Sequence, residues 1–319
     1  MDDKATAGSA QGPDLLGAVY PVGAVGQALA APGSCPTCGQ PSPPLDPQAT
    51  SAGWPVFAVG QLTAHTASVG ADKQLAQLTG GAHQGDQIDV GLLQQVLSRH
   101  ENAYMGFHLA WVLSTAGVDT FTVVPRSDDH VARLAEVLSP PEDGEVVHVI
   151  VGKTIPAPPD SPSAAAGLPA VQACQVLAFT LQEFAAAMPE DQASSDDQEA
   201  SGDDQGNRHA EFQTLVRRVF LRLTNGAALP GFTDEQRASA YVASQYPGFY
   251  HGIRHAQRDG KVLAGVYARH SHSTGRRVVS VGFTVRHPRA DMTEGWHCLV
   301  DVEEPCLHFL VTGLRPTYE

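Results

Sequence analysis

Basic residues are scarce in this sequence. It contains 20 Lys and Arg residues against 34 Asp and Glu residues, which gives a formal net charge of −14 over 319 residues. A surface with this charge repels nucleic acids and anionic membranes, so we expect neither as a partner. Half of the acidic excess lies in residues 190–204, which carry seven acidic residues and no basic one. The rest of the chain then carries about −7, an ordinary value for a globular protein.

Long apolar runs and disulfide-forming cysteines are scarce as well. No apolar run approaches the roughly 18 residues of a membrane span, and the segment MDDKATAGSAQGP lacks the basic and apolar regions of a secretory signal. The five cysteines are an odd number and too few for a disulfide scaffold of this size. We therefore expect a reducing, cytoplasmic location, where two closely spaced cysteines bind metal or carry out redox chemistry more often than they form a structural bridge.

The common catalytic motifs are missing too. The sequence has no GxSxG elbow, no P-loop and no GxGxxG fingerprint. Gly152-Lys-Thr follows a predicted strand but lacks the earlier loop glycines of a phosphate site. His251 and His255 have helical spacing, but no Glu stands between them in an HExxH pattern, and Gly252 weakens the helix. The sequence therefore favours a protein without catalytic activity.

The composition divides the chain into a tail and a body. Residues 1–53 are rich in Ala, Gly, Pro and Ser with little hydrophobic periodicity, which predicts a mostly disordered, low-complexity tail. Residues 54–319 predict a single compact domain of the α+β class. The acidic, Ser/Gln-rich segment at about 189–209 cannot bury enough apolar surface to offset chain entropy. We predict that it is a disordered insertion in the domain.

The first half of the body is predicted to be helical with a βαβ unit. A strand begins at Trp54, and helices are predicted at 88–97, capped by Asp89, and at 102–114. The segments 118–125, 128–138 and 145–152 are predicted to be strand, helix and strand, which favours a parallel pair of strands. Residues 171–184 are apolar and ambiguous between strand and helix.

The second half is predicted to be two or three helices followed by an antiparallel meander. One helix is expected at 210–223, and a second begins after a capping Thr233 and ends at Tyr246-Pro-Gly, with a shorter helix after it. From residue 262 the apolar pattern has a period of two, which predicts strands. The four predicted strands are 262–269, 277–286, 295–302 and 307–314.

The stretch SCPTCG in the tail is typical of half a zinc knuckle. Cys35 and Cys38 are spaced to place two thiolates on one ion, and Gly39 permits the tight turn that follows. A structural zinc needs two more ligands, and a redox pair or an idle pair of thiols are the alternative readings. Three completions of the site are open: Cys298 with Cys306, histidines such as His297 and His308, or the Cys35/Cys38 pair of a second subunit.

The three other cysteines bear on that choice. Cys298 alternates with Trp296 and Val300, which predicts a buried, inert position in a sheet. Cys174 lies in an apolar run and is predicted to be a core residue as well, whereas Cys306 follows a proline at a turn and is the freest. These predictions favour a zinc site shared across a homodimer.

Several short segments follow one another in a recognisable order over residues 54–319. They are Val56–Gln61, Glu101–Tyr104, Trp111–Leu113, Val118–Arg126, Thr233–Ala238, Tyr246–Tyr250, Val300–Val302 and Phe309–Tyr318. In this order they resemble the C-terminal domain of unknown function of cyanobactin maturation proteins of the PatG and PatA type. In that family the domain follows a subtilisin-like protease and macrocyclase, and the resemblance maps the knuckle onto Cys35 and Cys38.

The resemblance has limits that shape the functional prediction. This chain lacks the Gly-Thr-Ser-x-Ala segment of the protease, so protease and macrocyclase activity are not carried over. The acidic insertion and the long tail are not features of the family. We therefore predict a non-catalytic accessory protein, a scaffold for a precursor peptide or a biosynthetic enzyme in ribosomal peptide biosynthesis. The alternatives are a zinc-dependent peptide-modifying enzyme or hydrolase, and an interaction module whose acidic insertion binds a basic partner.

Overall fold

The computed structural model describes most of the body of the chain. The predicted tail and most of the predicted acidic insertion lie outside the described residues. Residues 52–319 belong to one compact unit of helices and two sheets, which confirms the α+β class. The described residues are 53–82, 88–138, 146–157, 162, 167–188, 202–225, 231–271, 275–289, 292–303, 306–311 and 313–317.

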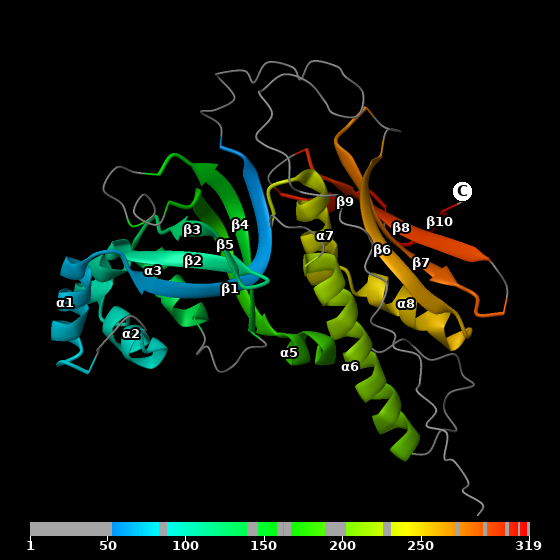
Figure 1. Ribbon diagram of the computed structural model, residues 1–319, viewed down its shortest axis with the longest axis horizontal. Helices are drawn as coiled ribbons and strands as arrows, with labels where there is room; N and C mark the ends of the chain where they lie inside the picture. The colour runs from blue at the N-terminus through cyan, green and yellow to red at the C-terminus, as the bar shows by residue number, and fades with distance from the viewer. Residues whose placement is uncertain are drawn as a thin grey trace, which may run out of the picture. The chain divides into compact units, whose positions relative to one another are not determined.

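The first sheet is a closed barrel with the strand order β1-β2-β3-β5-β4 (Figure 1). Strands β3 and β5 run parallel, and the other neighbouring pairs are antiparallel. Closure removes the unpaired edges that an open sheet of this size would have. The strands are β1 Pro55–Thr66, β2 Leu109–Thr115, β3 Val118–Val124, β4 Val146–Ile155 and β5 Ala170–Thr180.

The predicted parallel pairing within the first half is wrong. The strand–helix–strand segment exists as β3, α3 (Asp128–Val137) and β4, but β5 lies between the two strands. Strand β5 is parallel to β3 and antiparallel to β4, so β3 and β4 run in opposite directions. Local periodicity identified the elements, whereas the pairing depends on β5, which enters the barrel from later in the chain.

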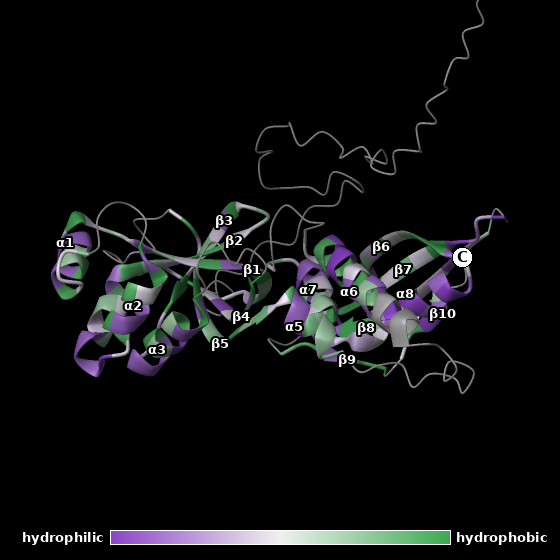
Figure 2. Cartoon of the chain, turned by 90° about the horizontal axis from the view of Figure 1, so that it is seen from below, coloured by the Kyte–Doolittle hydropathy of each residue, from purple (hydrophilic) through white to green (hydrophobic). Residues whose placement is uncertain are grey.

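Three α-helices and a 3₁₀-helix cover the barrel and share its core. In Figure 2, helices α1, α2 and α3 each carry hydrophilic and hydrophobic residues, as expected of helices that bury one face. Their N-caps are Ser68, Asp89 and Ser127, and the cap predicted at Asp89 is confirmed. The other elements are α1 Val69–Leu78, α2 Val90–Leu97 and the 3₁₀-helix η2 His100–His108.

The predicted helix at 102–114 is wrong over its second half. Residues 109–115 form β2, which is paired on both sides, with β1 and β3. Trp111 is fully buried, and its Nε1 donates a hydrogen bond of 2.8 Å to the carbonyl of Gly106. A strand that is buried on both faces lacks the alternation that identifies a strand, so its apolar run also matched a helical pattern.

The second sheet is open, with the strand order β10-β8-β7-β6 and the short β9 paired to β8. Strands β6, β7 and β8 form the predicted antiparallel meander. The fourth predicted strand, 307–314, is present only as the two-residue β9, and the short β10 begins just after it. The strands are β6 Val262–Ser271, β7 Val278–Arg286, β8 Thr293–Asp301, β9 His308–Phe309 and β10 Arg315–Thr317.

Helices α6 and α7 lie between the barrel and the open sheet (Figure 1). One hydrophobic cluster includes Phe57 and Val59 of β1, the inner faces of these helices, and Val281 and Phe283 of β7. The ambiguous run 171–184 resolves at Thr180, where a capping box ends β5 and begins α5. The helices are α5 Leu181–Ala186, α6 Gly202–Asn225, α7 Asp234–Gln245 and α8 Pro247–Arg258.

Helix α6 begins earlier than predicted. The acidic break was expected to extend to about residue 209, but the helix starts at Gly202 and includes Asp203 and Asp204 in its first turn. Within the described part of the chain, no helix is both long and apolar enough to cross a membrane.

Candidate functional site

A cavity of about 200 Å³ lies where β1, α6, α7 and β6 meet. One face of α7 supplies Glu235, Gln236 and Ser239 to its lining, and Arg222 comes from the last turns of α6. Val59 of β1 forms part of the apolar wall. The lining therefore combines charged, polar and apolar groups, which is the composition of a site that binds a small molecule or a side chain.

The first turn of α7 is fixed by its own caps. Thr233 Oγ1 accepts a hydrogen bond of 3.3 Å from the backbone N–H of Gln236, which confirms the predicted cap. Gln236 Oε1 accepts bonds of 3.2 Å from the N–H groups of Phe232 and Thr233. Before the helix, the carbonyl of Gly231 accepts a bond of 3.3 Å from the N–H of Phe57 in β1. These bonds hold the start of α7 against the barrel.

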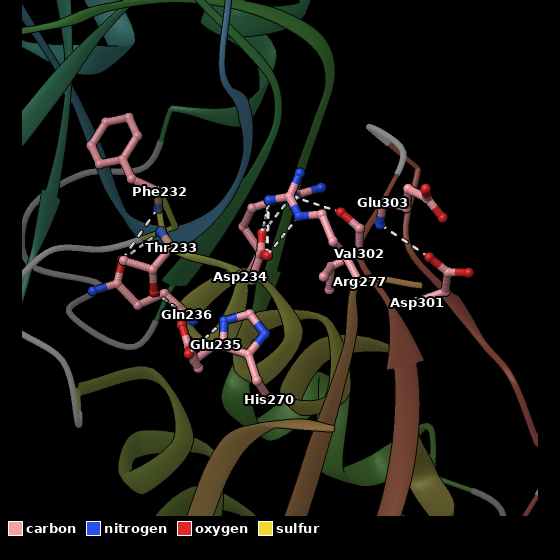
Figure 3. A network of polar contacts seen from close by, with 11 residues as sticks. Phe232, Thr233, Asp234, Glu235, Gln236, His270, Arg277, Asp301, Val302 and Glu303 are labelled. Atoms are coloured by element: carbon pink, nitrogen blue, oxygen red, sulfur yellow. Dashed lines mark hydrogen bonds and ion pairs between the residues drawn. The ribbon is translucent and has the colours of Figure 1, made fainter. Parts of the chain in front are cut away.

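Two guanidinium groups share the carboxylate of Asp234 (Figure 3). Arg277 donates to it through Nη2 at 2.7 and 2.8 Å and through Nε at 3.1 Å. Arg237 Nη1 lies 3.4 Å from the carboxylate and donates a 3.2 Å bond to the carbonyl of Val302. Burial lowers the pKa of Arg237, the charge of Arg277 lowers it further, and Asp234 opposes both effects. The network connects α7 to the start of β7 and the end of β8.

A second ion pair connects α7 to β6 at the rim of the cavity. His270 Nε2 lies 2.9 Å from Glu235 Oε1, and both side chains are partly exposed (Figure 3). Glu235 also lines the cavity, so the pair fixes one of its polar walls. The three polar or charged residues at the start of α7, from Asp234 to Gln236, are therefore all engaged in holding elements together.

Strand β6 presents its outer edge beside this cavity. It is the last strand of the open sheet, and no described strand pairs with the edge that faces away from β7. Its residues are mostly exposed or half-buried, and the segment from Val266 to Ala268 lines the cavity. An edge strand has backbone N–H and C=O groups to which an additional strand can bind.

A second cavity of about 220 Å³ lies on the other side of α6. Its lining includes Arg217 and Leu221 of α6 and the turn between β2 and β3, where Ala116 has a positive φ of 50°. Both cavities share Val59 and Thr224, so the last turns of α6 separate them. The exposed face of α6 thus lies between two hollows.

The predicted zinc ligands Cys35 and Cys38 lie outside the described residues. Cys298 is buried as predicted, and burial raises the pKa of its thiol to about 12, which opposes the thiolate that a metal needs. His297 faces the opposite side of β8, and Cys306 is exposed as predicted. His308 lies 3.6 Å from Asp301. The candidates for an intrachain completion are therefore not gathered at one place.

The prediction that Cys174 is a core residue is wrong. Its side chain is exposed, although its Sγ lies 3.3 Å from the carbonyl of Val151. The register of β4 and β5 shifts here, because Val151 pairs with Gln175 while Gly152 pairs with Ala173. Cys174 is thus the extra residue of a β-bulge, and a bulge turns its side chain away from the alternation that the sequence predicts.

The other residues considered at the sequence level have structural positions. His251 and His255 both lie on α8, and the His251 ring stacks on Phe212 with 5.3 Å between centroids. Gly152-Lys-Thr lies within β4 rather than in a loop before a helix. Among the described residues, no group of three or more His, Cys, Asp and Glu side chains is placed to hold a metal ion.

The sequence did not reveal the contacts that surround the cavity. Asp234 and Glu235 lie in the first turn of α7, where acidic residues are favoured by the partial positive charge of the helix start. Their partners Arg277 and His270 come from strands about 40 residues further along the chain. A cluster of charged residues at a capped helix start is the available signal, but it does not identify the partner.

Comparisons with known proteins agree with this fold. A model of the family described as "PatG Domain" matches residues 55–218, and one described as "PatG C-terminal" matches residues 206–316. A solved structure described as "PatG Domain of Unknown Function" is similar with a TM-score of 0.58 and 14% identity, over 83% of this chain and 99% of that chain. At that identity the likeness shows a shared fold. Comparison with curated proteins finds no match.

Proposed function

This chain belongs to the PatG domain family, and from that membership we propose that it is a non-catalytic accessory protein of ribosomal peptide biosynthesis. In this proposal it acts in the cytoplasm, in a pathway of the cyanobactin-like kind, and binds an extended peptide such as the precursor. The pathway rests on the family resemblance. The binding mode rests on one observation, the outer edge of β6 beside a cavity.

An extended peptide is the ligand that this arrangement fits. Backbone groups of an added strand bind to an edge strand, and pockets beside that edge select alternate side chains. The cavity next to Val266–Ala268 has both polar and apolar walls, so it suits a side chain of such a peptide. Two of the polar residues in its lining are already paired, Gln236 as a cap and Glu235 with His270, which supports a binding role rather than an acid–base role.

Hydrogen exchange tests the binding mode. We expect a precursor peptide gene beside this one, and its product is the probe, compared with a scrambled peptide of the same composition. We expect the precursor to slow exchange of the β6 amides, because an added strand would accept from the outward N–H groups. Absence of a precursor gene in the neighbourhood would contradict the biosynthetic assignment, and protection confined to other elements would contradict the edge site.

A cavity-filling variant gives a second test. Ser239→Phe places a ring in the cavity, and Gln245→Phe places the same ring at an exposed position at the end of the same helix. We expect weaker peptide binding in the first variant and unchanged binding in the second. Equal affinities in both variants would remove the cavity from the proposal.

The zinc site is part of the proposal as a structural element. We propose that Cys35 and Cys38 hold a zinc ion and that two copies of the chain complete four thiolates across a homodimer. Metal analysis of the purified protein beside a Cys35→Ser/Cys38→Ser double variant tests this. Wild-type protein without zinc, or the same zinc content in the variant, would contradict it. A monomer with bound zinc would contradict only the shared site.

A further inference from the structure

The outer face of the open sheet carries a row of four residues from four strands. Tyr267 of β6 pairs with Gly282 of β7, Gly282 pairs with His297 of β8, and His297 pairs with Arg315 of β10. The next residue along β8, Cys298, is in the hydrophobic core. Because side chains alternate along a strand, the row lies on the face that is turned away from the helices.

Hydroxyl and aromatic groups fix the geometry of this row. Thr317 Oγ1 lies 3.1 Å from Tyr267 Oη and 3.0 Å from His297 Nδ1, so one hydroxyl connects both side chains. The Tyr267 ring lies over Gly282, where an added Cβ would approach Tyr267 Cζ to 2.6 Å. Arg269 places its guanidinium carbon 5.1 Å from the centre of the same ring. The side chains are therefore held in place on a flat surface.

The charged residues in and beside this row, Arg315 and Arg269, are both basic in a protein that is acidic as a whole. Burial lowers the pKa of His297, and the charges of Arg269 and Arg315 lower it further, so both guanidinium groups act at the same imidazole. Residues 208–317 contain 14 of the 20 Lys and Arg residues of the chain and only nine acidic residues. The basic charge is thus concentrated in the part of the chain that forms this sheet and its helices.

We propose that the row of Tyr267, His297 and Arg315, with Arg269 beside it, binds the carboxylates of an acidic peptide segment. Guanidinium groups form paired hydrogen bonds to carboxylates, and Arg269 and Arg315 are both exposed on this face. Gly282 in the middle of the row lets the Tyr267 ring lie against the sheet, because a Cβ at this position would clash with the ring. A short acidic segment fits better than a nucleic acid, because the net charge of −14 repels a long polyanion.

The inference is independent of the peptide site at the β6 edge. Tyr267 also lines the cavity beside that edge, but Arg269, His297 and Arg315 are not part of its lining. A peptide at the edge binds through backbone groups, whereas this face selects charge. Failure of one site therefore leaves the other unaffected.

Fluorescence anisotropy with a labelled hexaglutamate peptide tests the charge selection, with a hexaglutamine peptide as the neutral match. We expect binding of the acidic peptide only, and about tenfold weaker binding in each of Arg315→Gln and Arg269→Gln. The matched control is Arg289→Gln, an exposed arginine at the turn after β7, which should leave the affinity within about twofold.

Three results would overturn the inference. They are equal binding of the neutral peptide, an unchanged affinity in Arg315→Gln and Arg269→Gln, and a loss in Arg289→Gln as large as theirs. If hexathymidylate bound as tightly and depended on the same arginines, the ligand of this face would be a nucleic acid rather than an acidic peptide. Loss of hexaglutamate binding in Ser239→Phe would place the peptide in the cavity at the β6 edge instead.

Nuclear magnetic resonance locates the bound peptide. We expect the amide signals of Gly282 and Gly295 to shift on addition of hexaglutamate. Gly282 is part of the row, and Gly295 lies beside Thr317. Shifts confined to α6, whose exposed face also carries arginines, would overturn the assignment to the sheet.

Discussion

Arg277 and Asp234 form a bidentate ion pair that joins the start of β7 to the first turn of α7. Asp234 is buried, whereas half of the Arg277 side chain is exposed. The same carboxylate lies beside Arg237, which is 1% exposed. Asp234 therefore balances a buried positive charge, and Arg277 orients it from the solvent side.

This arrangement predicts unequal effects of substitution at the two ends of the pair. Asp234→Asn leaves the guanidinium of Arg237 buried without its counter-charge, so the free energy of unfolding should fall by about 3–5 kcal/mol. Arg277→Gln removes a half-exposed partner and should cost about 1 kcal/mol. Urea denaturation of both variants measures these differences.

The control for this prediction is an ion pair on the surface. Arg133 and Glu136 lie 2.6 Å apart on α3, and both side chains are largely exposed. Glu136→Gln should change the free energy of unfolding by less than about 0.5 kcal/mol. If Asp234→Asn cost no more than Glu136→Gln, the buried network would not contribute to stability.

The buried position of His148 predicts that the protein loses stability in acid. Its Nδ1 accepts a 3.1 Å bond from the N–H of Leu62, and its Nε2 lies 2.7 Å from the carbonyl of Val137, so the ring is held in its neutral form. Burial lowers its pKa below the unfolded value of 6.5, and hydrogen bonds to backbone groups oppose that shift. As pH falls through 6.5, the unfolded chain gains a proton that the folded chain does not, and stability decreases.

Comparison with a variant isolates this contribution from the other histidines. The free energy of unfolding should fall between about pH 7.5 and about pH 5.5, and by a smaller amount in His148→Gln. The variant should be less stable than wild type at the higher pH, because its bonds to Leu62 and Val137 are altered. The same pH dependence in both proteins would assign the effect to other groups.

Local chemistry predicted the ends of elements better than their partners. The caps at Asp89 and Thr233 depend on side chains that contact their own helix, so the sequence contains the whole interaction. Residues 109–115 were misassigned because burial on both faces removes the alternation of a strand. The exposed Cys174 depends on a bulge, and a bulge is set by the register of two strands that are distant in sequence.

The candidate sites were hidden for the same reason. The row from Tyr267 to Arg315 spans four strands, and its members are neighbours only through the register of the sheet. The cavity beside β6 needs α6 and α7 to pack against the barrel. The sequence did contain one signal, the concentration of basic residues after residue 207 in an acidic chain.

Thiol reactivity should separate the three described cysteines. In a Cys35→Ser/Cys38→Ser background, Cys174 and Cys306 should react with an aromatic disulfide reagent in the folded protein, because both are exposed. Cys298 should react only after unfolding, since it is buried and the pKa of its thiol is raised to about 12. Mass spectrometry after timed quenching identifies each site, and fast modification of Cys298 would contradict its buried position.

The backbone conformation of Gly231, which lines the cavity, predicts that only glycine is well tolerated at this position. Its φ of 78° is rare for other residues, and an added Cβ would approach the carbonyl oxygen of Phe57 to 2.6 Å. Gly231→Ala should therefore lower the free energy of unfolding by about 2–3 kcal/mol, because strain and a clash with β1 act together. Gly80 has a φ of 64° and no atom within 4 Å of the same position, so Gly80→Ala should cost only about 1 kcal/mol. Equal costs in urea denaturation would show that the contact with β1 adds nothing to the strain.

A larger cost at Gly231, together with weaker peptide protection of β6, would connect the packing of the segment before α7 to the site beside it.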